Sequence, residues 1–554
     1  MKFNRRQTLL GLSASTLLPA GCATPGGFGQ MFATNRFRHG VASGDPRADS
    51  IVLWTRVSDL PRATDVTWRL ASDPAMQRVV SSGVVRAAPE NDYTAKVIAT
   101  NLQPGTTYYY QFAGAGDRSP IGRTRTLPVG RVDEVVLAVV SCSNYPFGYF
   151  NGYEAIAEDP DIDLVVHLGD YIYEYDIDGY GGAEGKRLGR MHEPAHEIVT
   201  LADYRQRHAQ YKTEPGALAM HAMHPFVHTW DDHESTNNSW LDGAENHQAD
   251  EGEWQRRKDN SLRAYYEWMP IRQPDGGRTP EQSWSHYQFG DLASLITLES
   301  RLSARSEQIN LADHRDALAD PEAAARFYAD IVGAEDRRLL SADMEAFLGS
   351  ELSESVSAGR PWRVLANQTI MADVRMPDID EPTFRERSAA LPDSLQPWLK
   401  DLTALGKLGL PGNMDAWDGY PAARDRLYRI AADSNATDLL VVTGDTHTFW
   451  QNQLFDKNGA RMGVELGTSA ITSPRGFWQL GDAAMERFDQ LNAARNKSVV
   501  WSDGSRRGYV RLSLTPDAAR ADFKALSNIG SRDYRVTDHR NVRIERRDNS
   551  LVYA

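Results

Sequence analysis

Short apolar runs alternate with longer stretches of helical spacing through most of the chain after residue 133. The runs are apolar at consecutive positions, which is typical of strands in a sheet covered on both faces. Their alternation with helices predicts an α/β domain with mixed sheets and flanking helices. The predicted strands are residues 135–140, 163–168, 225–230, 292–298, 362–365, 438–443 and 462–466, and the predicted helices are residues 149–158, 201–213, 260–269, 341–352 and 422–433.

The region before this domain has a different pattern. Residues 50–56, 65–70 and 107–112 are short runs rich in β-branched and aromatic residues, and turn sequences such as Gly44-Asp45-Pro46 separate them. This pattern predicts an immunoglobulin- or fibronectin-like β-sandwich over residues 34–128. Because the region gathers no cluster of titratable side chains, we expect it to have a packing or positioning role.

At 554 residues the chain is too long for one ordinary hydrophobic core, which agrees with two domains. We predict that the α/β domain spans residues 133–520 and that residues 521–554 form a C-terminal segment that could cap it. A Gly-rich stretch at residues 176–197 is predicted to form the rim of a cleft.

The first residues have the layout of a secretory signal. Lys2, Arg5 and Arg6 precede an apolar run over residues 9–20 that is too short to span a bilayer. The two arginines resemble a twin-arginine motif, which addresses proteins exported in the folded state, although an ordinary signal is the alternative. We therefore expect residues 1–23 to be a signal peptide and the mature protein to be periplasmic or on the cell surface.

The chain has only two cysteines, Cys22 and Cys142. Cys22 follows Leu-Pro-Ala-Gly, which resembles a lipoprotein signal with Pro19 at a position that is usually aliphatic. Cys22 is thus either lipidated, which would be the only membrane attachment we expect, or lost by cleavage. Cys142 then lacks an intramolecular partner, so it is either a buried structural thiol or a metal ligand.

The net charge of −14 argues against nucleic acid as a partner, because binding a polyanion needs a basic stripe. An acidic protein can still bind a small anionic substrate if metal ions reverse the local field. Small phosphate monoesters or diesters are anionic substrates of this kind. We expect the protein to act on them as a monomer.

Polar residues follow the predicted strands at their carboxyl ends, where open α/β sheets bind ligands. A polar residue at a single strand end, which we call a strand tip, is often only a helix cap or part of a turn. Five tips that each offer a metal-binding side chain predict a metal site. These side chains are Cys142, Asp170, Asp232, Asn367 and Asp445, with Tyr173, His233 and His447 close behind them.

The sequences Gly169-Asp-x-x-Tyr173, Asp231-Asp-His-Glu234 and Gly444-Asp-x-His447 resemble the motif series of calcineurin-like metallophosphoesterases. Together with His39-Gly-Val-Ala-Ser-Gly-Asp-Pro46 and Leu53-Trp-Thr-Arg56, they more closely resemble the PhoD-like alkaline phosphatase and phosphodiesterase family. The resemblance runs from about residue 37 to at least residue 473, and it implies the same two-domain layout.

The resemblance implies a centre of two metal ions that share Asp170. One ion would also bind Cys142, Tyr173 and His447, and the second would also bind Asp232, Asn367 and Asp445. Thiolate, phenolate and imidazole together favour Fe(III), and an all-oxygen shell favours Ca(II), with zinc, manganese or magnesium fitting less well. PhoD-like enzymes are associated with iron and calcium. Asn237 or Asn238 could bind a further calcium ion.

Such a centre predicts attack of an activated water on phosphorus, in line with the leaving group. His233 is our candidate for protonating the leaving group or binding a phosphate oxygen. Arg301 and Arg305 follow a predicted strand and could grip phosphate as a fork. His221, His224 and His228 are predicted to be structural.

These features favour an exported alkaline phosphatase. A phosphodiesterase or phospholipase D-like activity is the alternative on the same centre, because one water attack serves both kinds of substrate. A surface-anchored lipoprotein that binds without catalysis is the non-enzymatic alternative. A missing ligand would have favoured it, but every expected strand tip carries a suitable residue.

Overall fold

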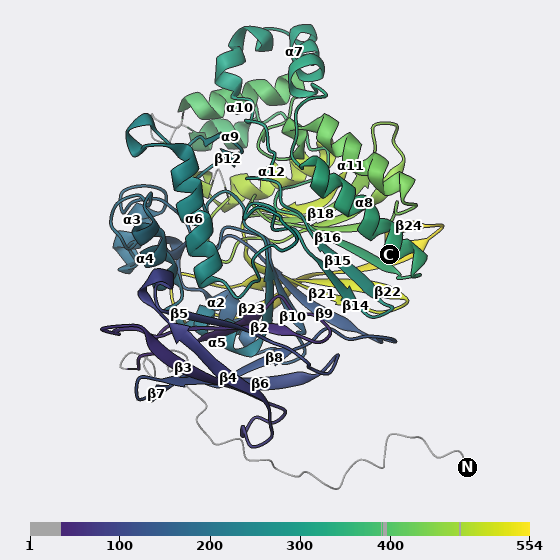
Figure 1. Cartoon of the computed structure of the whole chain (residues 1–554). Helices are drawn as coiled ribbons and strands as arrows, with labels where there is room; N and C mark the ends of the chain where they lie inside the picture. The colour runs from purple at the N-terminus through teal and green to yellow at the C-terminus, as the bar shows by residue number, and fades with distance from the viewer. Residues whose placement is uncertain (1–34, 389–390, 392–395, 476–477) are drawn as a thin grey trace, which may run out of the picture.

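The computed structural model describes residues 35–388, 391, 396–475 and 478–554. Two large β-sheets lie face to face, and helices cover the outer face of each (Figure 1). This arrangement, with the N-terminal β layers described below, confirms the predicted fold class. The predicted signal segment with Cys22 lies outside the described residues. Within the described part, no helix is long and apolar enough to cross a bilayer.

The larger sheet has ten strands and runs through both predicted domains. Its central strands β9, β10 and β11 are parallel, which is possible because helical segments connect them along the chain. In spatial order the strands are β24 (Ser550–Tyr553), β23 (Val536–Arg547), β22 (Ala518–Leu526), β21 (Arg507–Leu514), β9 (Val135–Val140), β10 (Leu164–His167), β11 (Pro225–His228), β1 (Val41–Gly44), β2 (Ile51–Arg56) and β5 (Thr94–Ala99).

The second sheet has seven strands, of which β15, β16, β17 and β19 are parallel neighbours. In spatial order they are β14 (His286–Phe289), β15 (Ala293–Thr297), β16 (Trp362–Ala366), β17 (Leu439–Thr443), β19 (Arg461–Gly467), β18 (Phe449–Phe455) and β20 (Val499–Asp503). A short hairpin of β12 (Ser239–Trp240) and β13 (Gly243–Ala244) lies beyond β11 in the chain.

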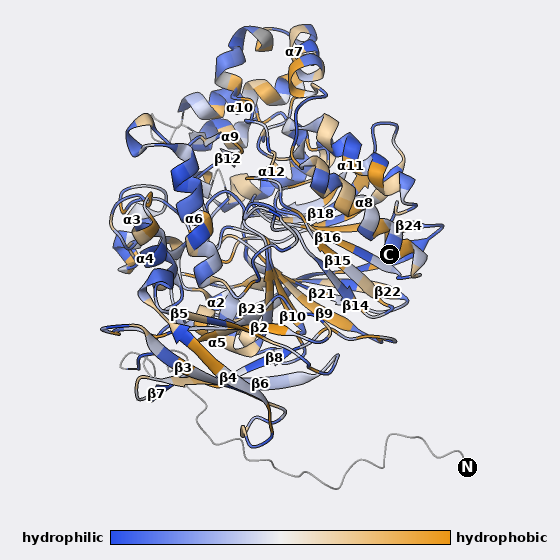
Figure 2. Cartoon of the chain, viewed as in Figure 1, coloured by the Kyte–Doolittle hydropathy of each residue, from blue (hydrophilic) through white to orange (hydrophobic). Residues whose placement is uncertain are grey.

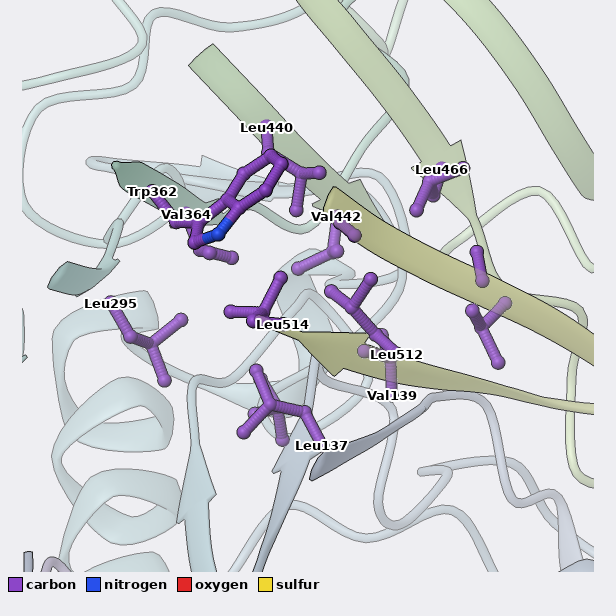
Figure 3. Packing of buried hydrophobic residues seen from close by; sticks show 14 of the residues in the cluster. Leu137, Val139, Leu295, Trp362, Val364, Leu440, Val442, Leu466, Leu512 and Leu514 are labelled. Carbon is purple, nitrogen blue, oxygen red and sulfur yellow. The ribbon is translucent and has the colours of Figure 1, made fainter. Parts of the chain in front are cut away.

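The main core lies between the two sheets, where side chains of alternate residues interdigitate (Figure 3). Leu137 and Val139 of β9 belong to this core, together with Val364 and Val442 of the facing sheet. The residues between them, such as Ala138, belong instead to the core under the helices. Because both faces are covered, all six residues of β9 are buried, which explains the continuous apolar run in the sequence. In Figure 2, β9 and β16 have the orange colour of hydrophobic residues, whereas α6 is largely the blue of hydrophilic residues.

Helices α2, α4, α5 and α6 cover the ten-stranded sheet, and α8 and α11 cover the seven-stranded sheet. Local sequence specifies where several of them begin. Thr200 and Asp203 form a capping box at α4, and the Ser341 side chain caps α8. These helices are α2 (Asn151–Ala157), α4 (Leu201–Tyr211), α5 (Pro215–Met223), α6 (Trp254–Trp268), α8 (Ala342–Ser357) and α11 (Pro421–Asp433).

A further group of helices packs together at the top of Figure 1 around a separate apolar cluster that includes Phe384, Leu402 and Phe488. It consists of α7 (Pro321–Phe327), α9 (Pro382–Ser388), α10 (Gln396–Leu408) and α12 (Asp482–Arg495). The short α3 (Gly182–Leu188) lies in the segment that was predicted to form a cleft rim.

The N-terminal module is a pair of β layers, as predicted. Its five-stranded sheet packs on β1, β2 and β5 through residues such as Trp68, Tyr110 and Leu53. β1 also pairs in parallel with β11, with Ser43 opposite Pro225. One layer of the module is therefore continuous with the sheet of the α/β domain. The five strands are β4 (Val79–Ala87), β3 (Thr64–Ala71), β6 (Thr107–Gly114), β7 (Asp117–Arg118) and β8 (Gly122–Arg125).

The C-terminal segment corrects the sequence prediction. The proposed boundary at residue 520 falls within β22, and residues 521–554 complete one edge of the ten-stranded sheet instead of forming a cap. The reason is the register, in which β22 pairs with β21 on one side and with β23 on the other.

Candidate metal centre

The carboxyl ends of five strands meet at one edge of the two facing sheets. β9, β10 and β11 come from the ten-stranded sheet, and β16 and β17 come from the seven-stranded sheet. The residues just beyond these strands are the ones that the sequence singled out. Cys142, Asp170, Tyr173, Asp232 and Asn367 each have an exposure of 3% or less. Burial of so many polar groups in one place needs compensating partners.

The backbone at these tips turns in an unusual way. Cys142, Asp170, Asp445 and His447 all have left-handed backbone angles, with φ between 54° and 60°. This region is sparsely populated by residues other than glycine, and strain of this kind costs on the order of 1–3 kcal/mol per residue. Four such residues at one edge show that the surrounding structure holds these side chains in place against a local cost.

Three side chains gather around one oxygen of Asp170. The Cys142 thiol lies 3.3 Å from Asp170 Oδ2, and the Tyr173 hydroxyl donates to the same oxygen at 3.1 Å. His447 Nε2 lies 3.4 Å from the Tyr173 oxygen. One ligand atom each from Cys142, Asp170 and His447 lies within 4.8 Å of the others. The structure thus brings together the four residues predicted to bind the first ion, and binding of a transition metal by them stays a prediction.

Asp170 also belongs to a second group. One ligand atom each from Asp170, Asp232 and His233 lies within 4.8 Å of the others. Asp170 Oδ1 is buried and has no hydrogen-bond partner among the described residues. A buried carboxylate oxygen without a partner is costly unless a cation takes that place. The donor set therefore fits a metal on both sides of Asp170.

Asn367 and Asp445 complete the predicted oxygen ligands at the tips of β16 and β17. The Trp417 indole donates to Asn367 Oδ1 at 3.2 Å, which fixes the orientation of the amide. The main-chain carbonyl of Asp445 lies 4.0 Å from the Cys142 sulfur. The structure thus brings these two residues to the same edge as the other candidates.

Burial and mutual repulsion dominate the electrostatics of the site. Burial, reinforced by the Asp170 carboxylate, raises the pKa of the Cys142 thiol well above its usual value. Burial and neighbouring carboxylates likewise raise the pKa of Asp170 and of Asp445 well above their usual values. A bound cation would reverse these shifts, because it stabilises the thiolate and the carboxylates.

A second set of residues orients the ligands. The Glu234 carboxylate accepts hydrogen bonds from the backbone amides of Asp170, Tyr171 and Asp231, and so ties the β10 and β11 tips together. The His447 ring lies with Nδ1 at 2.6 Å from the Pro474 carbonyl, which leaves Nε2 directed at the site.

His233 lies at the site in a defined orientation. Its Nδ1 lies 2.7 Å from Glu174 Oε2, and its ring stacks on Tyr173 at a centroid distance of 4.2 Å. Burial lowers the pKa of His233, but the carboxylates of Asp232 and Glu174 outweigh burial and raise the pKa well above its usual value. Glu174 was not assigned a role from the sequence, although it directly follows Tyr173, the last residue of the Asp170 motif.

Arg301 and Arg305 do not match their predicted role. Arg301 Nη1 and Nη2 donate to the two oxygens of Asp415 at 2.7 Å, and its Nε donates to Asp231. Arg305 also donates to Asp415. Both arginines are almost fully buried. Carboxylates engage Nε, Nη1 and Nη2 of Arg301 and Nη2 of Arg305, and Nη1 of Arg305 donates to the Ser300 carbonyl. The geometry therefore gives both arginines a positioning role instead of a phosphate fork. Sequence patterns could not have shown this, because Asp415 is more than 100 residues away.

The remaining candidates occupy supporting positions. The Asn238 backbone amide donates to Asp232 Oδ2 at 2.7 Å, and the Asn237 backbone amide donates to Glu174. Binding of a further calcium by either side chain stays a prediction. His221 and His224 lie at the end of α5, and His228 lies in β11, all buried, as expected for structural residues.

Comparison with known proteins agrees with this geometry. Residues 137–523 match the model of the PhoD-like phosphatase family, and residues 21–128 match the model of its N-terminal domain. The chain belongs to the PhoD-like phosphatase family. Alkaline phosphatase D of Bacillus subtilis is 33% identical over 510 residues, which cover 89% of this chain and 78% of that protein. A solved structure of PhoD superposes with a TM-score of 0.75 and 29% identity, over 94% of this chain and 93% of that one.

As a PhoD-like phosphatase, the chain is a phosphoric ester hydrolase. PhoD-like phosphatases depend on metals, and the two donor groups that share Asp170 are among the described residues that could bind them at this edge. A purple acid phosphatase from seeds of yellow lupin (Lupinus luteus) also aligns, over 90% of this chain and 73% of its own, with a TM-score of 0.48 and 11% identity.

Proposed function

We propose that this protein is an exported alkaline phosphatase that hydrolyses phosphate esters at a dinuclear metal centre. The observation that carries the proposal is Asp170, whose carboxylate belongs to two donor groups at once and has one buried oxygen without a partner among the described residues. A bridging carboxylate is the role that suits both facts.

The donor types support iron and calcium as the two metals. Cys142, Tyr173 and His447 offer sulfur, phenolic oxygen and imidazole nitrogen, a set that favours a transition metal and, with the phenolate, Fe(III). Asp232, Asn367 and Asp445 offer only oxygen, which favours Ca(II). When bound, the two ions would supply the charge that polarises the phosphoryl group and activates the attacking water.

The residues of the chain then have separate tasks. Asp170 and its neighbours hold the charge at a fixed position, because four residues at three strand tips have constrained backbone angles. The hydrogen bond with Glu174 engages Nδ1 of His233 and leaves Nε2 for the substrate. From there His233 can donate a hydrogen bond to a phosphate oxygen or a proton to the leaving group.

The N-terminal residues support export, because the basic residues and apolar run at residues 2–20 have the layout of a signal peptide. Periplasmic or surface location follows from this proposal, and Cys22 would provide a lipid anchor if it is retained. We further propose that the protein acts as a monomer on small phosphate esters.

Assays with p-nitrophenyl phosphate and bis-p-nitrophenyl phosphate on one metal-analysed preparation test the proposal. We expect hydrolysis of the monoester with an alkaline optimum. Preference for the diester on the same centre would favour the phosphodiesterase alternative. Absence of hydrolysis in a preparation that contains both metals would contradict the proposed function.

A further inference from the structure

A cavity of about 380 Å³ opens directly from the metal centre. Asp445 and His447 form part of its lining, so it is continuous with the site where the phosphoryl group would lie. The helices α10 and α12 contribute the opposite wall through residues such as Leu402 and Phe488. A volume in this range suits a small organic group.

The walls of this cavity are mostly apolar. Ile370, Met376 and Leu402 are buried hydrophobic residues of its lining, and Trp398 lies at the rim with 39% exposure. An alkyl or aryl group that enters the cavity would therefore be removed from water on several sides.

The two arginines of the lining do not make it a site for a second anion. Arg375 Nε donates to Asp373 at 2.7 Å, and Arg475 Nη1 donates to Asp489 at 2.7 Å. Each cation is thus paired with a carboxylate. The cavity favours a neutral group over a polyphosphate chain.

One buried nitrogen of the lining lacks a hydrogen-bond partner among the described residues. Asn492, on the same face of α12 as Phe488, is only 1% exposed, and its Nδ2 has no hydrogen-bond partner among the described residues. Buried donors of this kind are rare and call for a ligand or a water.

A chain of hydrogen bonds fixes the orientation of this amide. The Arg375 backbone amide donates to Asn496 Oδ1 at 2.7 Å, so Asn496 must present its Nδ2 on the other side. That Nδ2 donates to Asn492 Oδ1 at 2.8 Å. The free group of Asn492 is consequently the donor and not the acceptor.

We propose that this cavity binds the organic group of the phosphate ester, and that Asn492 recognises a hydrogen-bond acceptor on that group. The substrate class is then a phosphate ester of a largely apolar alcohol that carries a carbonyl or ether oxygen. This inference rests on the proposed function, because it places the phosphoryl group at the metal centre next to Asp445 and His447.

Alkylphosphonates test the inference by binding alone, because their P–C bond is not hydrolysed. Calorimetric titration of the full metal-loaded chain would compare ethylphosphonate, hexylphosphonate and hexylphosphonates with a ketone at C3, C4 or C5. Each fully buried methylene strengthens binding by up to about fourfold, so we expect at least about tenfold between ethyl and hexyl. At least one ketone should bind about threefold or more tightly than hexylphosphonate itself.

The variant Asn492→Asp keeps the acceptor for Asn496 and removes the free donor, so it should abolish the ketone preference and keep the chain-length dependence. Asn151→Asp is a control for burying a carboxylate away from the cavity, because Asn151 is also 1% exposed, lies on helix α2 and does not line the cavity. It should keep both preferences. Trp398→Ala, at the exposed rim, should weaken the hexyl advantage by about twofold or more.

Equal affinity for ethyl- and hexylphosphonate would overturn the inference, as would a ketone preference that both aspartate variants lose equally. Failure of the proposed function would give a different result. The metal-loaded protein would then not hydrolyse p-nitrophenyl phosphate, independently of how tightly it binds the phosphonates.

Discussion

Two clusters of buried histidines lie in the described part of the chain, one at the strand tips and one between β11 and the helices α4 and α5, and only the first has the surroundings of a metal site. At the metal centre, His447 and His233 lie beside carboxylates, a thiol and a phenol. In the other, which we call the histidine cluster, His208, His221 and His228 pack around Lys212 and aromatic rings. Tyr171 lies next to Asp170 in the chain, and its hydroxyl contacts His221 at 3.0 Å.

The difference between them is the charge of their neighbours. Burial lowers the pKa of His208, His221 and His228 well below the usual value, and the nearby Lys212 lowers it further. At the metal centre, carboxylates outweigh burial for His233. Buried histidine alone therefore does not indicate a metal site, whereas histidine beside a shared carboxylate does.

The largest expected effect comes from Asp170, which belongs to both donor groups. Asp170→Asn keeps the shape but removes the charge that both ions would share. We expect loss of metal and a decrease in kcat/KM of about 10³-fold or more, on the scale of losing a main charge-stabilising group. Elemental analysis and steady-state kinetics of the variant measure both. A metal-replete variant with normal activity would show that the centre lies elsewhere.

A matched pair of histidine variants tests the comparison itself. His447→Ala should lose the transition metal and about 10²-fold or more in kcat/KM, because Nε2 of His447 faces the Asp170 group. His221→Ala, in the histidine cluster, should keep its metal content and change kcat/KM by less than about threefold. Thermal melts of both proteins separate these effects from misfolding. If the two variants behave alike, the distinction between the clusters is wrong.

Glu174 should have an intermediate effect, because it orients His233 without contacting the phosphoryl group. Glu174→Gln is expected to lower kcat/KM by about 10–100-fold with metal content maintained, as for other residues that orient a ligand or catalytic histidine. The alkaline limb of the pH–rate profile should also move to lower pH, since Glu174 raises the pKa of His233 and His233 donates only in its protonated form. An unchanged profile together with normal activity would remove His233 from the proposed mechanism.

The smallest effect on activity is expected at Lys212. Burial lowers its pKa to about 7, against about 10.5 in the unfolded chain. Between these values the unfolded state binds one more proton, so the free energy of unfolding should rise with pH by up to about 1.4 kcal/mol per unit from this residue. Lys212→Met should flatten this part of the stability profile between pH 7 and 9 and leave kcat/KM within about twofold. Denaturant titrations of the wild type and the variant at several pH values measure how the free energy of unfolding depends on pH. The same slope in both proteins would contradict the assignment.

Much of this arrangement could be predicted from the sequence because it depends on local pattern. Apolar runs of strand length and the polar residues that follow them predicted the β9, β10, β11, β16 and β17 tips, and thereby the candidate ligands. Cys142 was singled out because an unpaired thiol needs an explanation in a chain that we expect to be exported.

The parts that could not be predicted depend on contacts between distant segments. Asp415 engages Arg301 and Arg305 across more than 100 residues, and no periodicity indicates that pairing. The parallel pairing of β1 with β11, which joins the two predicted domains, and the addition of residues 521–554 to the sheet edge are likewise decided by tertiary packing. The orienting roles of Glu174 and Glu234 appear only when the strand tips are brought together.

The central claim is that two different metals share Asp170, and the metal content of the protein as purified tests it most directly. Elemental analysis and a visible spectrum of the wild-type protein and of Cys142→Ala would be recorded on samples of known activity. We expect iron and calcium in the wild type, with a visible band from tyrosinate-to-iron charge transfer that Cys142→Ala weakens or loses together with activity. A colourless wild type that contains zinc, with full activity retained in Cys142→Ala, would contradict the claim.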